Sequence, residues 1–195
     1  MNKMQQQLKN SEEKQLIGYI ESSILEFGQK FINPKYKYAF FATEDSVKCY
    51  LYHLIASNKE FLQDLEYTTS EGEKIITWRL HSELATFDII KSKCGHFDLC
   101  ITNSDNDFSE RSKDNLACIE IEWVSDLEDS YNELKSVLNK LSNPKNEVEN
   151  GYLLILNDDK GFTAKDLTIL SKLKKQYKGI KLFIFDAVKN AKYKF

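Results

Sequence analysis

The chain has 195 residues, of which 42% are hydrophobic and 29% are charged, with 7 glycines and 2 prolines. This composition excludes an intrinsically disordered or low-complexity protein and supplies enough apolar residues for the core of a single domain. No stretch approaches the roughly 18 apolar residues of a membrane span, and residues 1–10 are polar and lack the apolar region of a signal peptide. We therefore expect a soluble, cytoplasmic protein that makes no use of a membrane.

The formal net charge of −3 conceals an uneven distribution. From Lys160 onward the chain has ten lysines and two acids, Asp166 and Asp186, so this segment carries a formal charge of +8. Residues 1–159 therefore carry a formal charge of −11. A basic segment of this kind can attract the phosphates of a nucleic acid. The alternative, which the spacing favours, is the solvated face of an amphipathic helix. The lysines concerned are Lys172, Lys174, Lys175 and Lys178.

The first part of the chain is predicted to be helical. Apolar residues recur at helical spacing from about Ser11 to Phe27 or beyond, and again after Thr43. Asn33-Pro34 separates the two helices, because a residue before proline avoids the helical conformation. Thr43 is a suitable N-cap for the second helix, and Glu44 follows in the first turn, where the helix dipole favours an acid.

From residue 75 the apolar period changes to two, which predicts strands. Residues 75–84 form the first, residues 87–92 extend it or form a second short strand, and residues 96–102 form the next after a turn at Gly95. Strict alternation sorts residues 96–102 into two faces. Phe97, Leu99 and Ile101 are predicted on one, and His96, Asp98 and Cys100 on the other.

Residues 116–124 are the most strand-like segment of the chain, and alternation places Glu120 and Glu122 together on one of its faces. The sequence from Ser125 to Glu128 matches the S-x-x-E capping box, so a helix is expected directly after this strand. Beyond Asn143-Pro144, the pattern predicts a strand at 151–157, a helix capped by Thr163 that ends at Gly179, and a last strand at 181–186.

The order of these elements indicates an α/β protein (mixed α-β-α) whose central mixed sheet of about five strands is flanked by helices, with an extra N-terminal helix. Residues 1–195 are expected to form a single domain. Its parts are the N-terminal helix and connection at 1–42, a core at 43–186 and a basic tail at 187–195. The four cysteines include no C-x-x-C pair and the three histidines are widely spaced, so we interpret the cysteines as buried thiols rather than zinc ligands.

Three acids are the best candidates for chemistry. If strand 96–102 pairs with strand 116–124, Asp98 approaches Glu120 and Glu122. Mg²⁺ and Mn²⁺ prefer such oxygen ligands, and a bound ion of this kind activates water and neutralises a phosphodiester transition state. The alternative is a solvated sheet face, but the strand is otherwise apolar, where an unpaired carboxylate is costly to bury. The sequence therefore predicts a metal site with Asp98 and Glu120 as ligands.

Other common catalytic motifs do not occur in the sequence. It contains no G-x-S-x-G, no G-x-x-x-x-G-K-[ST] and no G-x-G-x-x-G. Serine hydrolases of the first type and nucleotide-binding proteins of the other two are therefore disfavoured.

The segments Gly95–Ile101 (GHFDLCI) and Ala117–Trp123 (ACIEIEW) resemble the core of the PD-(D/E)XK, or restriction endonuclease-like, nuclease superfamily, over roughly residues 43–157. The resemblance implies a restriction endonuclease-like core at 43–186 and a metal-dependent nuclease acting on DNA. Asp98 then matches the first acid of the motif and Glu120 the second. The family often adds an acid from the helix before the sheet, for which Glu44 is suitably placed.

The sequence departs from the motif at Glu122, which stands where the family usually has lysine. Some restriction enzymes of this superfamily carry glutamate there and still cut DNA, so Glu122 is predicted to be a further ligand or base. Some members carry a replacement lysine on the following helix, which makes Lys135 a candidate, although an exposed helix lysine is the more ordinary interpretation.

Two accessory residues complete the predicted site. Glu83 on the first strand is a candidate outer group of the same cleft, unless it merely ends that strand near solvent. His96 is a candidate contact for phosphate or substrate, and a hydrogen-bonded structural histidine is an equally good interpretation.

The sequence thus favours a Mg²⁺- or Mn²⁺-dependent nuclease that hydrolyses phosphodiester bonds, with the basic C-terminal segment contacting the nucleic acid backbone. The alternative is a catalytically inactive nuclease-fold protein that binds nucleic acid or a protein partner, for example in a defence or mobile-element system. The missing motif lysine and the overall acidity motivate this alternative. A homodimer is compatible with both.

Overall fold

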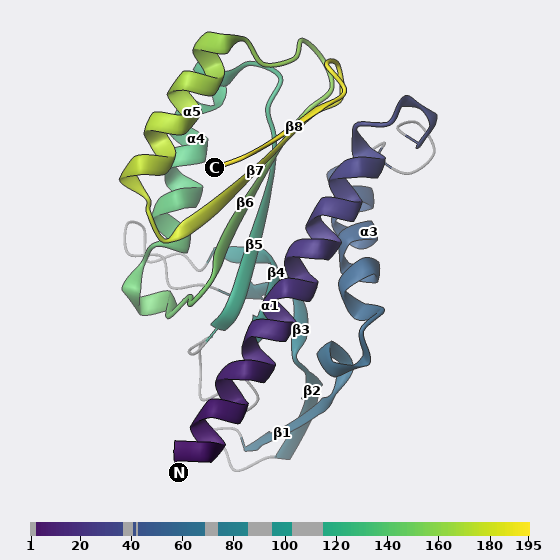
Figure 1. Cartoon of the computed structure of the whole chain (residues 1–195), viewed down its shortest axis with the longest axis vertical. Coiled ribbons are helices and arrows are strands. Elements are labelled where there is room, and N and C mark those ends of the chain that lie inside the picture. The colour runs from purple at the N-terminus through teal and green to yellow at the C-terminus, as the bar shows by residue number, and fades with distance from the viewer. Residues whose placement is uncertain (1–2, 37–40, 42, 69–73, 86–94, 103–114) are drawn as a thin grey trace.

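A computed structural model describes residues 3–36, 41, 43–68, 74–85, 95–102 and 115–195 (Figure 1). The chain begins with a long helix, α1 (Lys3–Phe31), followed by α3 (Glu44–Ala56) and a short 3-10 helix, η1 (Lys59–Leu62). Strands β1 (Asp64–Thr68) and β2 (Lys74–Trp78) then form a separate antiparallel sheet of two strands.

The central sheet has six strands in the order β3-β4-β5-β6-β7-β8. Their bounds are β3 (Leu80–Ala85), β4 (His96–Thr102), β5 (Asn115–Trp123), β6 (Gly151–Asn157), β7 (Ile180–Asp186) and β8 (Ala191–Lys194). Strands β5, β6 and β7 are parallel, and the other neighbours are antiparallel. The parallel strands are connected by α4 (Leu127–Leu141), which precedes the 3-10 helix η2 (Pro144–Asn146), and by α5 (Ala164–Gln176). The predicted mixed α/β class is therefore confirmed.

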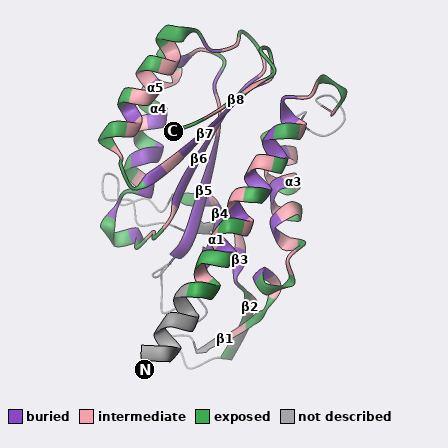
Figure 2. Ribbon diagram, in the orientation of Figure 1, coloured by how far each residue is buried: buried purple, intermediate pink, exposed green. Residues whose placement is uncertain are grey.

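Helices cover both faces of the sheet, so there are two hydrophobic cores (Figure 1). Helices α1 and α3 pack on the face that carries Ile119 and Leu154, whereas α4 and α5 pack on the face that carries Leu153 and Ile155. Figure 2 shows the strands between the helices as the most continuously buried part of the molecule. Because alternate residues of β6 enter different cores, this strand is apolar throughout, as expected for a parallel strand buried on both faces.

The strands differ from the predicted ones in three respects, and α1 begins at Lys3 rather than at about Ser11. The predicted strand 75–84 is divided at Arg79, and its two halves, β2 and β3, belong to different sheets. Arg79 is buried and donates from Nε to the carbonyl of Thr102 at 3.2 Å. Strand β1 was not predicted, because its sequence DLEYT is largely polar. Strand β8 lies in the predicted basic tail and adds a sixth strand to the sheet. The predicted strand at 87–92 lies outside the described residues.

The helix starts agree with the predicted caps at Thr43 and Thr163, and both form capping boxes. At α4 the cap is Asp126 rather than Ser125, since the Asp126 side chain accepts the backbone N–H of Glu128. None of the helices that the structure describes has the length and apolar character needed to cross a membrane.

Gly28 allows α1 to approach the sheet closely. A Cβ atom at this position would overlap the ring of Phe185 on β7, whereas a Cβ atom at Gly18, on the same helix, would meet no atom within 4 Å. We expect Gly28→Ala to lower the free energy of unfolding by about 1–3 kcal/mol through overpacking. Gly18→Ala should instead raise it by up to about 1 kcal/mol because alanine favours the helix. Urea denaturation of the two variants measures both effects, and equal shifts would contradict close packing at Gly28.

Candidate active site

Asp98 lies where β4 and β5 stop pairing. The last paired residues at this end are Leu99 and Ile119, and beyond them the Asp98 Oδ2 atom accepts the backbone N–H of Ile121 at 2.8 Å. The alternation of β4 is also broken here. Phe97 packs in the α4–α5 core and Leu99 in the α1–α3 core, so the prediction that these two share a face is wrong. The carboxylate of Asp98 is thus fixed between two strands by a main-chain hydrogen bond.

Lys48 of α3 connects two of the predicted acids. Its Nζ atom lies 3.1 Å from Asp98 Oδ1 and also forms an ion pair with Glu83 on β3. Burial lowers the pKa of Lys48, but the hydrogen bonds to Glu83 and Asp98 outweigh it and raise the pKa well above its usual range. Lys48 therefore remains a cation at any physiological pH.

Glu83 occupies an uncommon backbone conformation. Its φ of 57° is in the left-handed region, which costs a residue with a side chain about 1–2 kcal/mol. The neighbours Ser82 and Leu84 pair with Leu99 and Phe97, the residues on either side of Asp98. Glu83 consequently lies across the strand pair from Asp98, as a strained residue beside the candidate site.

Glu120 is the most deeply buried acid of the site, with a side chain only 3% exposed. Its Oε2 atom lies 2.7 Å from Nζ of Lys140 on α4, and Lys140 also donates to the carbonyl of His96 at 2.9 Å. Its Oε1 atom has no hydrogen-bond partner within the described part of the chain. A buried carboxylate oxygen that lacks a partner is costly, which indicates a position suited to a bound group.

The protonation of Glu120 reflects its surroundings. Burial raises the pKa of Glu120 to about 8, and the nearby charges of Asp98 and Glu122 raise it as well, whereas Lys140 lowers it. The single ammonium group therefore does not compensate fully for burial and for the neighbouring carboxylates.

Glu122 is perturbed in the same direction. Burial and the carboxylates of Glu133, Asp98 and Glu44 together raise the pKa of Glu122 to about 7, although Lys140 acts in the opposite direction. Acids from α3, β4, β5 and α4 thus converge on the end of β5. A carboxyl group that titrates near neutrality can exchange a proton at physiological pH.

The cluster contains more carboxyl groups than ammonium groups. We define the acid cluster as Asp98, Glu120, Glu122 and Glu83, with Lys48 and Lys140 as its cations. Four carboxylates and two ammonium groups leave a charge of −2 when all are ionised, which a divalent cation would neutralise. No group of three or more His, Cys, Asp or Glu side chains among the described residues has the geometry of a preformed metal site. In the structure, Lys48 contacts Asp98 and Lys140 contacts Glu120, the two predicted metal ligands.

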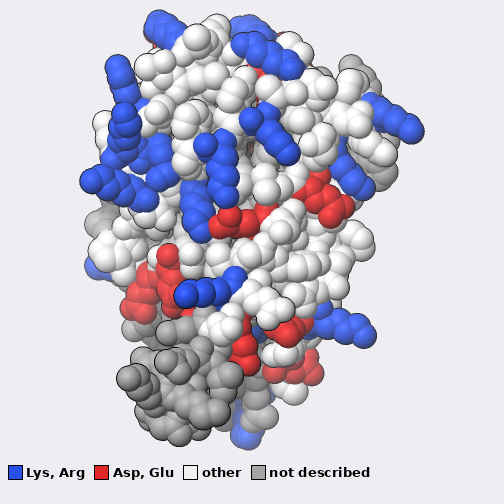
Figure 3. All heavy atoms as spheres, viewed as in Figure 1, with Lys and Arg blue, Asp and Glu red and all other residues white. Residues whose placement is uncertain are grey.

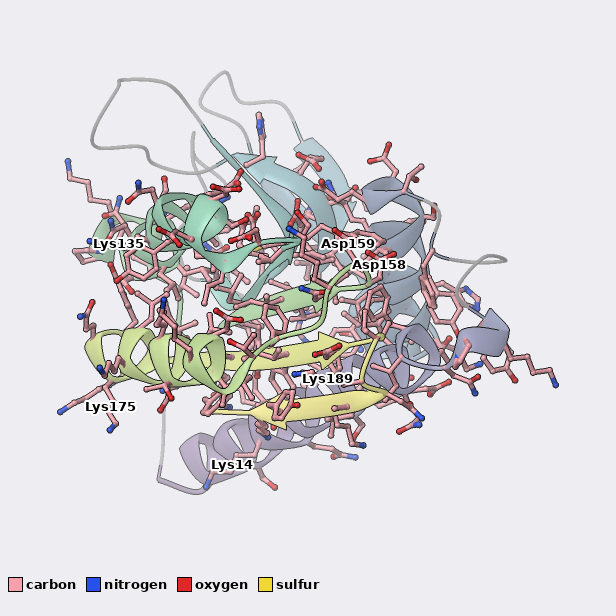
Figure 4. All side chains as sticks on the ribbon, turned by 90° about the horizontal axis from the view of Figure 1, so that it is seen from above. Lys14, Lys135, Asp158, Asp159, Lys175 and Lys189 are labelled. Carbon is pink, nitrogen blue, oxygen red and sulfur yellow. The ribbon has the colours of Figure 1, made fainter. Side chains whose placement is uncertain are left out.

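The predicted site residues fall into two groups. Asp98, Glu120, Glu122 and Glu83 come together, and Glu44 is close enough to influence Glu122. His96 contributes its carbonyl, while its side chain is exposed. Lys135 does not reach the cluster, because its Nζ atom lies over the ring of Tyr131, 6.0 Å from the centroid. Figure 4 shows Lys135 on the outer side of the α4–α5 layer, together with Lys175.

Two cations of the cluster, Lys48 and Lys140, were not predicted from the sequence. Lys48 follows Glu44 by four residues, so the two share a face of α3, and this spacing is a signal that sequence reasoning can use. Lys140 lies one helical turn and a half beyond Lys135 on α4, and its sequence gives no comparable signal.

The lysines of α5 lie apart from the acid cluster. Figure 3 shows lysines gathered over α5 and the adjacent strands β7 and β8. Lys174 donates to the carbonyl of Lys178 at the end of α5, while Lys172, Lys175 and Lys178 are exposed. Lys181 and Lys194 both pair with Glu21 of α1, which neutralises part of the surface.

A crevice of about 820 Å³ lies between the N-terminal ends of α4 and α5. Three lysines and three acids line it, namely Lys160, Lys165, Lys172, Asp126, Glu128 and Asp166. Asp126 pairs with Lys160 at 3.6 Å and caps α4, and Asp166 accepts the backbone N–H of Thr163. These charges balance one another, and none of the acid-cluster residues lines this crevice. We therefore place the candidate chemistry at the acid cluster.

Comparisons with known proteins gave no match to a protein-family model, a curated protein or a solved structure. The functional assignment consequently rests on the acid cluster itself.

Proposed function

We propose that this protein is a divalent-metal-dependent nuclease with a restriction endonuclease-like core, in which Asp98 and Glu120 hold Mg²⁺ or Mn²⁺. The observation that carries the proposal is Glu120, a buried carboxylate with one oxygen unpartnered among the described residues and with further acids beside it. These are the oxygen donors that hard divalent cations prefer, and two carboxylates with water suffice for Mg²⁺.

The residues of the cluster have separable roles in phosphodiester hydrolysis. A metal bound by Asp98 and Glu120 would act as a Lewis acid and lower the pKa of an attacking water. Glu122, with its pKa raised to about 7, accepts a proton from that water at neutral pH. Lys48, fixed beside Asp98, provides the positive charge that the strand motif lacks at Glu122 and stabilises charge that develops on the phosphate.

The proposed substrate is nucleic acid, with DNA as the first choice. Exposed lysines on α5, such as Lys172 and Lys175, provide backbone contacts that add affinity without sequence preference. A homodimer, in which each copy cuts one strand, fits the same proposal.

Metal titration followed by a cleavage assay tests the proposal. Millimolar Mn²⁺ is expected to raise the melting temperature of the wild-type protein, since a ligand bound only by the folded state stabilises it. Glu120→Gln should lose this stabilisation, and Glu122→Gln should lower DNA cleavage by about 10²–10⁴-fold. Glu12→Gln, an exposed acid of α1, is the matched control and should behave as wild type. Wild-type protein that neither responds to Mn²⁺ nor cuts nucleic acid would overturn the assignment.

One observation favours a second candidate function, a non-catalytic nuclease-fold protein that binds nucleic acid or a protein. Lys48 and Lys140 already form ion pairs with the carboxylates of Asp98 and Glu120. If these ion pairs replace the metal permanently, the melting temperature will not respond to Mn²⁺, and Lys140→Met will destabilise the protein equally with and without the ion.

A further inference from the structure

We propose that Cys100 and Cys118 are a redox modification site, at which a small oxidant of the peroxide class joins β4 to β5 through a disulfide. The two thiols lie on the strands that carry Asp98 and Glu120, two residues from each acid. Formation of this disulfide does not require that the protein bind a metal or cut nucleic acid, so it goes beyond the proposed function.

The strand register places the two cysteines directly opposite each other. Cys100 and Cys118 are Cα partners in the antiparallel pair of β4 and β5. The N–H of Cys118 donates to the carbonyl of Asn150, on the side of β6, at 3.0 Å, so it does not bond to β4. The two cysteines therefore form a non-hydrogen-bonded pair, in which opposing Cα atoms are about 4.5 Å apart. A disulfide spans Cα separations of about 4.4–6.8 Å, so it fits without a change of register.

The two side chains already point toward each other. Both enter the core formed with α4 and α5, and their Sγ atoms are 3.2 Å apart. Asn115 fixes the orientation of Cys100, because its Oδ1 atom accepts the thiol proton at 3.1 Å while its amide donates to the carbonyl of Asn146 at 2.7 Å. An S–S bond is about 2.05 Å long, so small side-chain rotations bring the sulfur atoms into bonding distance.

The reaction removes two electrons from the pair of thiols. The thiolate of one cysteine attacks an oxygen atom of hydrogen peroxide, which breaks the O–O bond, forms a sulfenic acid and releases one water after protonation. The second thiol then attacks the sulfenic sulfur, forms the S–S bond and expels the oxygen as a second water. Two thiols and one peroxide thus give one disulfide and two waters, and both thiol protons end in the waters.

Access of the oxidant to the thiols limits the rate. Both thiols are fully buried, and a buried thiol ionises with difficulty, so a small oxidant and a local opening are needed. The pairing of β4 with β5 becomes irregular between Ile101 and Thr102, and β5 begins at Asn115. The cysteines consequently lie close to an end of the paired segment, and strand ends open at a lower free energy than the centre of a sheet. We therefore expect the disulfide to form more slowly than the exposed Cys49 reacts.

The disulfide is expected to stabilise the folded protein. It closes a loop of about 18 residues, which restricts the unfolded chain and lowers its entropy. For a protein of this size the melting temperature should rise by about 5–10 °C.

Peroxide treatment of the folded protein tests the site. The starting protein combines Cys49→Ser with Cys94→Ser, because Cys49 is exposed and Cys94 lies outside the described residues, so only Cys100 and Cys118 can react as thiols. Dilute hydrogen peroxide should yield peptides joined through these two cysteines with the loss of two hydrogen atoms, which mass spectrometry without reduction detects. The melting temperature of the same sample should rise, and a dithiol reductant should reverse both changes.

Cys118→Ser in the same background is the matched control, and it should form no internal cross-link and show no rise in melting temperature. Because each sample is compared with itself before and after oxidation, the result does not depend on the stability of the control. Thiols that stay free after prolonged exposure, a sulfinic acid at either cysteine in place of the S–S bond, or a cross-link that lowers the melting temperature would each overturn the proposal. A missing response to Mn²⁺, measured separately, would count against the proposed function and not against the disulfide.

Discussion

Without metal, the titration of Glu120 is expected to make the wild-type protein less stable as the pH rises from about 5 to about 8.5. Glu120 has a pKa of about 8 in the folded protein against 4.5 for the free side chain. Between these values the folded state binds more protons than the unfolded state, so the free energy of unfolding falls as the pH rises. The stabilisation that protonated Glu120 contributes is complete below pH 4.5 and is lost as the pH passes the pKa of Glu120 in the folded protein. The loss is at most about 3–5 kcal/mol for this group, and Glu122 contributes in the same direction.

Urea denaturation at pH 5, 7 and 9 measures this dependence, with Glu120→Gln as the informative variant. Glutamine keeps the shape of the side chain but does not ionise, so the dependence on pH should become shallower. Addition of Mn²⁺ at pH 8.5 should restore stability to the wild-type protein and not to Glu120→Gln. Glu12→Gln, which changes an exposed acid, should keep the full wild-type dependence. A wild-type protein that is most stable at pH 9 without metal would show that Glu120 is not a strained buried acid.

The core strands could be predicted because their sequence pattern is local. The segment around Ile119 and Ile121 is rich in apolar and β-branched residues, which favour a strand, and a helix-capping sequence follows it directly. A strand followed by a helix could therefore be predicted. Asp98 and Glu120 were likewise found from spacing, since two neighbouring strands bring mid-strand acids together when they pair.

The rest of the site depends on contacts between distant parts of the chain. Lys140 reaches Glu120 only because α4 packs over β5, and its sequence neighbours do not distinguish it from Lys135. The break in alternation at Asp98 has the same origin, since the packing of Phe97 against α4 and α5 overrides the period of two. Hydrophobic periodicity shows which face of a helix or strand is apolar. It does not show which long side chain, such as that of Lys140, reaches an acid on a neighbouring element.

A large effect on folding is also expected from a substitution at Asp98. Alanine at this position removes the acceptor of the Ile121 N–H and one of the two acids that hold Lys48. The free energy of unfolding should fall by about 2–4 kcal/mol, because an N–H and part of an ammonium group lose their partners in a poorly solvated place. Asparagine keeps an acceptor oxygen in the same position, so Asp98→Asn should lose only about 1–2 kcal/mol, mainly from the weaker contact with Lys48.

The two variants separate the structural role of Asp98 from its proposed role as a metal ligand. Both should lose stabilisation by Mn²⁺ and DNA cleavage, since a neutral side chain is a poor ligand for a hard cation. Only Asp98→Ala should be strongly destabilised without metal, which urea denaturation at pH 6 measures. If Asp98→Asn keeps both cleavage and the Mn²⁺ response, Asp98 serves only to join β4 to β5 through Ile121, and the metal ligands must be sought among Glu120 and Glu122. If Asp98→Ala is as stable as Asp98→Asn, the hydrogen bond to Ile121 does not hold the strands together, and the charge of Asp98 is retained for chemistry alone.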